Sequence, residues 1–309
     1  MRVLFFGTPD IAVPTLRALC DSEHEVCGVV TQPDKRQGRK MELKFPAVKE
    51  FALSRELPVY QPERLKDGAL NPILEKLRPD LLVVIAYGRI LPDDVLNFAP
   101  YGAINLHASL LPKYRGAGPI QWAVINGERE TGVTVMQMDS GLDTGDMLYT
   151  VSTPIGEEET AGELFERMAP LCAEALLTAL PKIERRELTP KKQEESLASY
   201  APMLSKEMAK LDFSDAERCH NQIRGMNPWP VAYTFYRGKK LKVFTARTGC
   251  TSSIAPDRQG YAIGTPEGIS VRCGKGILLL TEVQLEGGKR MDASAFLMGH
   301  PMDCAEELR

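Results

Sequence analysis

Several patterns that would assign this chain of 309 residues to a familiar class are missing from it. No apolar run reaches the roughly eighteen residues that a membrane-spanning helix needs, so we expect no membrane partner. None of the seven cysteines forms a CxxC pair, which excludes a zinc ribbon or thioredoxin motif and favours free thiols in a reducing cytosol. The apolar run Val3-Leu4-Phe5-Phe6 begins directly after Met1 and Arg2, so we expect a first strand, no signal or transit peptide, and a cytoplasmic protein.

The turn after this run lacks the glycines of a dinucleotide-binding loop. It reads Gly7-Thr8-Pro9-Asp10, without the second and third glycines of a GxGxxG motif. Without those glycines the backbone cannot approach a pyrophosphate closely. A Rossmann oxidoreductase is therefore disfavoured, and an ordinary turn from strand to helix is expected.

The first half of the chain alternates short apolar runs with helix-like stretches. Strands are predicted at 3–6, 26–31, 81–86, 103–106 and 133–138, and helices at 45–55 and 119–125. The run 81–86 is apolar throughout, as expected for a central strand that is buried on both faces. This alternation predicts an α/β domain with a Rossmann-like, doubly wound and mostly parallel sheet.

The sequence pattern changes after a highly charged stretch. A capping box at 160–163 predicts a helix toward residue 180, which Pro170 should kink or split. Beyond it, glycines separate short strand-like runs at 231–236, 241–246, 269–273 and 277–283, a pattern typical of a small barrel. We therefore predict a catalytic domain at 1–189, a linker at 190–205 and a smaller, OB-like C-terminal β-barrel domain at 206–309.

Two stretches carry candidate chemistry. Strand alternation places Asn105 and His107 on the same side, at the sheet edge where ligands bind. Asp143 lies between Gly141 and Gly145, where it could orient His107 and stabilise its charge. Alternatively, His107 is a structural histidine at a turn, and Asp143 forms a turn together with its neighbours Asp139 and Asp146. The spacing of these acids matches no EF-hand, and we expect no metal.

Together these stretches resemble the folate-dependent formyltransferase family. Asn105, the run His107-Ala108-Ser109-Leu110-Leu111-Pro112 and the run Leu142-Asp143-Thr144-Gly145 carry the resemblance, which continues through motifs such as Asn227-Pro228-Trp229-Pro230 over nearly the full length. The resemblance implies that Asn105, His107 and Asp143 are catalytic and that Ser109, Leu110, Leu111 and Pro112 contact the folate. The pterin is expected beside Ile85, Tyr87, Gly88, Ile90 and Leu91, for most of which core packing is the alternative.

The resemblance also implies a reaction. The formyl group of 10-formyltetrahydrofolate would pass to an amine, and the length and C-terminal motifs select initiator methionyl-tRNA as the acceptor. Asn105 would donate a hydrogen bond to the oxyanion, His107 would move a proton, and Asp143 would orient His107. No covalent intermediate is needed, and a monomer is expected.

Basic residues are candidates for contact with the tRNA. Residues 34–49 carry six Lys and Arg against two acids, 237–242 carry four against none, and 206–309 carry 15 against 12. Such side chains gain affinity by neutralising phosphates, although each run could also be an ordinary solvated face. The resemblance places the family's basic loop at 35–44, and the candidates are Lys35, Arg36, Arg39, Lys40, Lys206, Lys239 and Lys240.

Other acceptors remain open. A formyltransferase acting on glycinamide ribonucleotide is expected to end near residue 200, and one acting on an aminosugar nucleotide is expected to lack the basic 35–44 loop. A non-catalytic RNA-binding protein with the same fold is a further alternative, disfavoured by the intact set of Asn105, His107 and Asp143.

Overall fold

The computed structural model describes residues 1–37, 42–66, 68–248, 258–302 and 305–309. The chain divides into two compact units. Unit 1 comprises Met1–Pro119, Glu130–Pro154 and Phe165–Pro202, and unit 2 comprises Ile120–Arg129, Ile155–Leu164 and Met203–Arg309. Among the described residues, no helix has both the length and the apolar character needed to cross a membrane.

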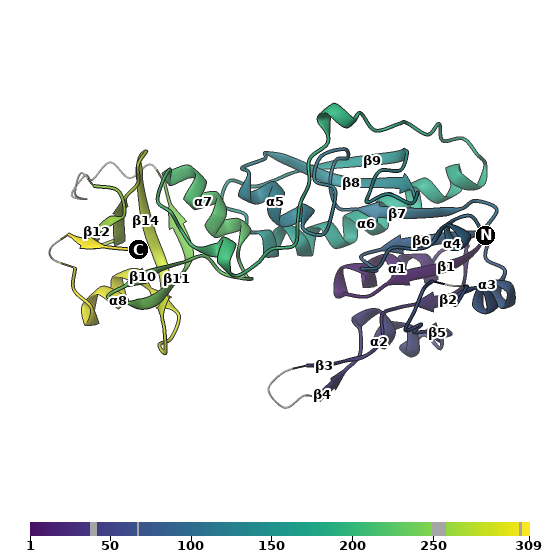
Figure 1. The fold of residues 1–309 in the computed structure, drawn as a ribbon, viewed down its shortest axis with the longest axis horizontal. Coiled ribbons are helices and arrows are strands. Elements are labelled where there is room, and N and C mark those ends of the chain that lie inside the picture. Colours follow the sequence, from purple (N-terminus) through teal and green to yellow (C-terminus); the bar gives the residue numbers. More distant parts are fainter. Residues whose placement is uncertain (38–41, 67, 249–257, 303–304) are drawn as a thin grey trace. The chain divides into compact units, whose positions relative to one another are not determined.

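Unit 1 is built on a seven-stranded sheet (Figure 1). In spatial order its strands are β5 (Val59–Tyr60), β2 (Glu25–Val30), β1 (Arg2–Gly7), β6 (Leu81–Ile85), β7 (Ala103–His107), β8 (Glu130–Gln137) and β9 (Met147–Pro154). The pairs from β5 to β7 are parallel, whereas β8 and β9 are antiparallel. The chain winds outward from β1 in both directions, which confirms the predicted doubly wound, mostly parallel sheet.

The central strands form because their residues are apolar on both faces. Every residue of β6 is buried, and Val3 to Phe6 in β1 are fully buried. Helices and short 3-10 turns complete unit 1: η1 (Asp10–Ala12), α1 (Val13–Cys20), α2 (Ala47–Ser54), α3 (Asn71–Leu77), α4 (Asp93–Leu96) and η2 (Glu195–Leu197). A separate hairpin pairs β3 (Lys35–Gln37) with β4 (Glu42–Lys44). The carboxyl ends of β1, β6 and β7 meet at one edge, as parallel strands require.

The long helix α6 (Ala161–Glu184) excludes a split at Pro170, one of the two outcomes predicted there. Thr160 and Glu163 form the expected capping box. The Thr160 N–H donates to the Glu163 carboxylate at 2.8 Å, and the Glu163 N–H donates to the Thr160 hydroxyl at 3.3 Å. The helix nevertheless continues through both Pro170 and Pro181 without splitting. Buried side chains on both sides of Pro170, including Met168 and Cys172, hold the two halves in place, so packing offsets the lost backbone hydrogen bond.

Unit 2 contains an antiparallel sheet that closes on itself. Its strands, in spatial order, are β10 (Tyr233–Tyr236), β11 (Lys239–Arg247), β14 (Ile277–Leu285), β13 (Gly268–Arg272), β12 (Tyr261–Thr265) and β16 (Glu306–Glu307), with β15 (Met291–Asp292) beside β14. Phe235 and Arg309 then exchange two backbone hydrogen bonds of 2.8 and 3.2 Å, which join the last segment to β10. The predicted C-terminal barrel is therefore confirmed.

Helices pack on this barrel. They are α5 (Pro119–Ile125), which lies almost wholly in unit 2, the turn η3 (Glu207–Ala209), α7 (Ala216–Gly225) and α8 (Ala293–Gly299). Helix α7 begins where the Asp215 side chain accepts hydrogen bonds from the backbone of Glu217 and Arg218. Its buried residues Cys219 and Ile223 join the strands in one apolar core.

Candidate active site

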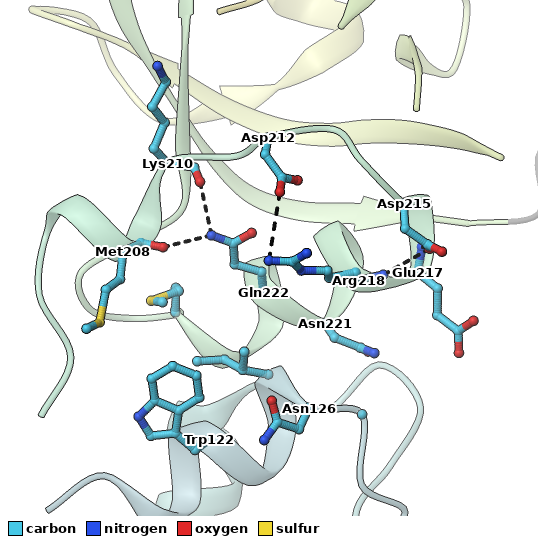
Figure 2. A pocket seen from close by; sticks show the side chains of 13 residues that line it. Trp122, Asn126, Met208, Lys210, Asp212, Asp215, Glu217, Arg218, Asn221 and Gln222 are labelled. Atoms are coloured by element: carbon cyan, nitrogen blue, oxygen red, sulfur yellow. Dashed lines mark hydrogen bonds and ion pairs between the residues drawn. The ribbon is translucent and has the colours of Figure 1, made fainter. Parts of the chain in front are cut away.

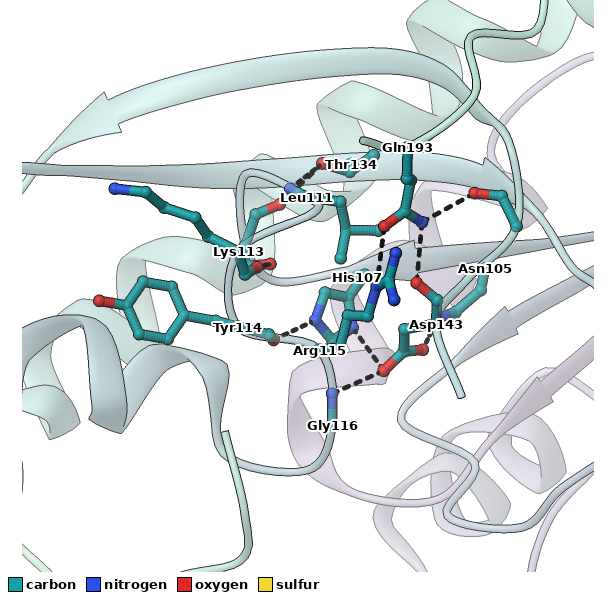
Figure 3. A network of polar contacts seen from close by, with 12 residues as sticks. Asn105, His107, Leu111, Lys113, Tyr114, Arg115, Gly116, Thr134, Asp143 and Gln193 are labelled. Atoms are coloured by element: carbon teal, nitrogen blue, oxygen red, sulfur yellow. Dashed lines mark hydrogen bonds and ion pairs between the residues drawn. The ribbon is translucent and has the colours of Figure 1, made fainter. Parts of the chain in front are cut away.

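Two side chains at the carboxyl end of β7 reach the same carboxylate (Figure 3). The Asn105 amide donates to Oδ1 of Asp143 at 3.4 Å. The Nδ1 atom of His107 lies 3.5 Å from Oδ2 of the same residue. The structure therefore brings together the three residues predicted to be catalytic, although two of them are 38 positions apart in the chain.

The ring of His107 is held between two hydrogen-bond acceptors. Its Nε2 atom lies 2.8 Å from the carbonyl oxygen of Tyr114, and its Nδ1 atom faces Asp143. A carbonyl oxygen can only accept, so Nε2 must carry the hydrogen of this contact, and Nδ1 is the ring nitrogen that faces the carboxylate. His107 is only 5% exposed, so its ring orientation is fixed by these two contacts.

The loop that carries Asp143 needs unusual backbone geometry. Asp143 has φ of 55°, in the left-handed region. A Cβ atom on Gly145 would lie 1.7 Å from the carbonyl oxygen of Gln137, so only glycine fits there. Asp139 is a turn former, because its carboxylate accepts from Gly141 and Thr144. Asp143 instead accepts from the backbone of Gly116 at 2.8 Å, which points its carboxylate toward β7.

The segment predicted to contact folate follows directly from β7. The buried Ser109 donates to the carbonyl of Lys113 at 2.7 Å, and its own carbonyl accepts from Thr134 at 2.7 Å. Thr134 also accepts from the backbone N–H of Leu111 at 3.2 Å. Leu111 is buried, while Leu110 and Pro112 are half-buried. The segment is thus a rigid turn next to Asn105 and His107.

The residues predicted to line the pterin pocket have different environments. Tyr87 and Leu91 are 2% exposed and belong to the core of unit 1, and Ile85 is equally buried at the end of β6. The Tyr87 hydroxyl finds no hydrogen-bond partner among the described residues. Gly88 is exposed, and Ile90 is 74% exposed. Of these predicted residues, only Gly88 and Ile90 are therefore accessible to a ligand unless neighbouring side chains move.

The described basic candidates occur in both units. Lys35 and Arg36 are exposed on β3 of the hairpin in unit 1, whereas Arg39 and Lys40 lie outside the described residues. In unit 2, Lys206 and Lys239 are exposed. The Lys240 ammonium lies 4.0 Å from the centre of the Tyr233 ring, a cation–π contact on the barrel.

Sequence reasoning missed a polar network around the buried Arg115, next to the site. The Gln193 amide donates to the backbone carbonyls of Asp143 and Gly145 at 2.8 Å each, and it accepts from Nε of Arg115 at 3.0 Å (Figure 3). Arg115 is 1% exposed and also pairs with Glu195. Gln193 stands in a charged stretch that was expected to be a linker, and no pattern in the sequence indicates its distant partners.

A cavity lies wholly within unit 2 (Figure 2) and has a volume of about 670 Å³. Its polar residues are explained by local structure. Gln222 donates to the carbonyls of Met208 and Lys210, Arg218 pairs with Asp212, and Asp215 caps α7. The lining includes none of the predicted site residues.

Comparison with known proteins identifies the family. The family model described as "Formyl transferase" matches residues 1–180, and "Formyl transferase, C-terminal domain" matches residues 203–301. The chain belongs to the formyl transferase family. The resemblance inferred from Asn105, His107 and Asp143 is thus confirmed at the level of the family.

Relatives align over nearly the whole chain. A protein of Citrifermentans bemidjiense named methionyl-tRNA formyltransferase is 49% identical over 98% of this chain and 94% of its own length. One of the same name from Caldanaerobacter subterraneus subsp. tengcongensis is 46% identical over 97% of both chains.

Solved structures share the fold at lower identity. The sugar 3N-formyl transferase WlaRD, solved with dTDP and 5-N-formyl-THF, has a TM-score of 0.68 at 18% identity and aligns over 92% of this chain and 97% of its own. HypX from Aquifex aeolicus, solved with tetrahydrofolic acid, has a TM-score of 0.60 at 18% identity, and this chain spans 47% of its length. These likenesses support the fold class alone.

Proposed function

We propose that the protein transfers the formyl group of 10-formyltetrahydrofolate to the free amino group of initiator methionyl-tRNA, giving formylmethionyl-tRNA for translation initiation. The observation that carries this proposal is the shared carboxylate of Asp143, which lies against both Asn105 and His107. The near full-length relatives named methionyl-tRNA formyltransferase support the choice of acceptor.

The reaction is an acyl transfer to an amine. The amine nitrogen forms a bond to the formyl carbon, and the carbonyl oxygen becomes an oxyanion in a tetrahedral intermediate. The bond between that carbon and the folate nitrogen then breaks, while the amine loses a proton and the departing nitrogen gains one. Protein groups must therefore stabilise one negative oxygen and move one proton.

Asn105 is suited to stabilise the oxyanion. Its amide donates to Asp143 over a long 3.4 Å, and it makes no other hydrogen bond within the part of the chain that the structure describes. One N–H is thus free to point at the developing charge, and the side chain is half-buried, where such a bond is strong. Losing a donor of this kind typically costs about 100- to 1000-fold in rate.

His107 is suited to move the proton. Its Nε2 hydrogen is committed to Tyr114 at 2.8 Å, whereas Nδ1 has only the longer contact to Asp143. A proton taken from the amine at Nδ1 would be stabilised by that carboxylate and could then pass to the folate nitrogen. Asp143 keeps the ring in the required orientation throughout.

The folate would lie beside the rigid turn Ser109–Pro112 and the segment after β6. Ile90 and Gly88 are exposed and would contact the ring system directly, while Ile85 and Leu91 support the wall from the core. The Tyr87 hydroxyl, which has no hydrogen-bond partner among the described residues, would supply a polar group for the pterin, because a buried hydroxyl gains free energy from any partner. Leu110 and Leu111 add apolar surface.

The tRNA would bind through exposed basic groups on both units. The hairpin contributes Lys35 and Arg36, to which the proposal adds Arg39 and Lys40, and the barrel contributes Lys206, Lys239 and Lys240. The proposed functional division is a catalytic domain at 1–189, a connecting segment at 190–205 and a tRNA-binding domain at 206–309. We further propose that the enzyme is a monomer, acts in the cytoplasm and uses no metal.

A competition among acceptors tests this function. The protein is incubated with 10-formyltetrahydrofolate and, in separate reactions, charged initiator methionyl-tRNA, glycinamide ribonucleotide or an aminosugar nucleotide, and the formylated product is measured. We expect product with the charged tRNA and essentially none with either small acceptor. Formylation of a small acceptor without any formylation of the tRNA would overturn the proposal.

A further inference from the structure

We infer that residues 193–201, here called the strap, position His107 by holding both of the groups that its ring faces. This inference rests on the proposed role of His107 in formyl transfer. The strap follows helix α6 and precedes the barrel segment, and it carries no residue of the predicted site. Its two ends contact two different loops of unit 1, and each loop supplies one acceptor to the histidine.

The first end of the strap holds the Asp143 loop. The Nε2 group of Gln193 donates to the carbonyls of Asp143 and Gly145 at 2.8 Å each. Asp143 adopts φ of 55°, a left-handed conformation that costs free energy for a residue with a side chain. Such a conformation persists only where the surroundings hold it, and both hydrogen atoms of the Gln193 amide serve that purpose.

The second end of the strap holds the carbonyl of Tyr114. The Tyr114 N–H donates to the hydroxyl of Ser199 at 2.9 Å, and the Arg115 N–H donates to the Ser199 carbonyl at 2.8 Å. The N–H of Ala201 then donates to the Arg115 carbonyl at 2.7 Å. Tyr114 is also left-handed, with φ of 62°, so this short bridge maintains the direction of the carbonyl that accepts from His107.

Arg115 connects the two ends. Its guanidinium donates through Nε to Gln193 at 3.0 Å and through both terminal nitrogens to Glu195 at 2.7 and 3.0 Å. The side chain is 1% exposed, so these three are bonds of a buried cation, and each of its nitrogens donates at least once. The two acceptors of His107 are thereby fixed relative to each other and not only to the sheet.

Removing the hydrogen bonds of Gln193 without removing its volume tests the first end. In Gln193→Met the side chain keeps its length but cannot donate to Asp143 or Gly145. We expect kcat for tRNA formylation to fall about 10- to 100-fold, as small misplacements of catalytic groups do, while KM for folate and for tRNA stays within about twofold. The control is Ser196→Ala, which removes an exposed hydroxyl bonded to Glu194 in the same strap and should leave kcat unchanged.

The second end is tested with a matched pair at Ser199. Ser199→Ala removes the acceptor of the Tyr114 N–H and should lower kcat, whereas Ser199→Thr keeps a hydroxyl and should restore most of the activity. Circular dichroism and thermal unfolding establish that each variant is folded. If Gln193→Met does not fold, Gln193→Glu, which keeps the acceptor for Arg115 but loses the donors, takes its place.

A double-mutant cycle separates positioning from general stability. Because Gln193 is inferred to act through Asp143, Gln193→Met should change kcat by less than about twofold in an Asp143→Asn background. An equal fold-loss in both backgrounds, or wild-type kcat in Gln193→Met, would overturn the inference. Failure of the wild-type protein to formylate methionyl-tRNA would instead overturn the proposed function, so the two failures are distinguishable.

Discussion

The Asp143 site and the basic surface of the barrel use polar residues in opposite ways. At the site, Arg115 is 1% exposed and His107 is 5% exposed, and their nitrogens are matched by acceptors at defined distances. On the barrel, Lys206 and Lys239 are exposed, and Lys240 lies over an aromatic ring. The two polar groups compared at the site are buried, whereas Lys206 and Lys239 on the barrel are exposed to water.

Under the proposed function, this difference would correspond to two physical tasks. Formyl transfer needs hydrogen-bond donors that already point at the developing charge. Such donors keep their direction when neighbouring buried groups hold them by hydrogen bonds. Attachment of a nucleic acid needs positive charge that phosphates can reach, and its strength depends on salt because counterions are released. Changes at the site should therefore lower kcat, whereas changes on the basic surface should raise KM for the tRNA.

The largest effect is expected from Asn105→Ala. Because the amide is proposed to donate to the oxyanion, kcat should fall about 100- to 1000-fold, with little change in KM for the tRNA. Steady-state kinetics with charged initiator tRNA measures both constants. A loss confined to KM would show that Asn105 binds substrate and does not stabilise the transition state.

A smaller effect is expected from the paired change Lys239→Ala and Lys240→Ala. It should raise KM for the tRNA, leave kcat nearly unchanged, and make the plot of log KM against log salt less steep by about one for each phosphate that the variant no longer neutralises. Lys76→Ala, an exposed lysine in α3, serves as a control for the removal of a positive charge elsewhere on the surface. If the control weakened tRNA use as much, net charge and not this surface would account for the effect.

Tyr87→Phe tests a case that fits neither region, because it removes a polar group that is buried but unpaired among the described residues. The free protein should unfold at the same or a higher temperature, since an unsatisfied hydroxyl is lost. If that hydroxyl binds the pterin, KM for folate should rise about 2- to 10-fold, the range of one neutral hydrogen bond. An unchanged KM would assign Tyr87 to the core alone.

The smallest effect is expected from Glu195→Gln. The hydrogen bond from Arg115 holds the pKa of Glu195 below its usual range, so this pair stabilises the folded state above the ordinary pKa of the carboxyl. That stabilisation is lost as the pH falls through the lowered pKa of the folded state. Glu195 is exposed, so solvent screens the pair and the loss of stability in Glu195→Gln should be slight at neutral pH and vanish in acid. Thermal unfolding as a function of pH measures it; a difference that grows in acid would contradict the sign.

Local sequence patterns predicted the features of the fold that depend on the residues of one short segment. The apolar run at 81–86 became β6 (Leu81–Ile85), and the cysteines described by the structure are free thiols, with Cys250 and Cys304 outside the described residues. Strand β9 (Met147–Pro154) was not predicted, because its residues are mostly half-buried or exposed and lack an apolar run. Backbone hydrogen bonds between Phe235 and Arg309 close the barrel. They involve no side chain, so no pattern in the sequence predicts them.

Only the residues whose side chains take part in the proposed chemistry could be predicted from the sequence. Strand alternation and flanking glycines indicated Asn105, His107 and Asp143, and the structure places them together. The acceptor supplied by Tyr114 is a backbone carbonyl, which any residue would provide. Gln193 and Ser199 act on backbone atoms too, so their identities in a charged stretch gave no signal.

The salt dependence of the two kinetic constants tests the division of labour between the regions most directly. Formylation of charged initiator tRNA by the wild-type protein is measured at saturating folate over a range of ionic strength. We predict that log KM for the tRNA rises linearly with log salt, while kcat and KM for folate stay within about twofold, because the buried site is screened little. A kcat that falls in parallel with tRNA binding, or a KM for the tRNA that ignores salt, would contradict this account.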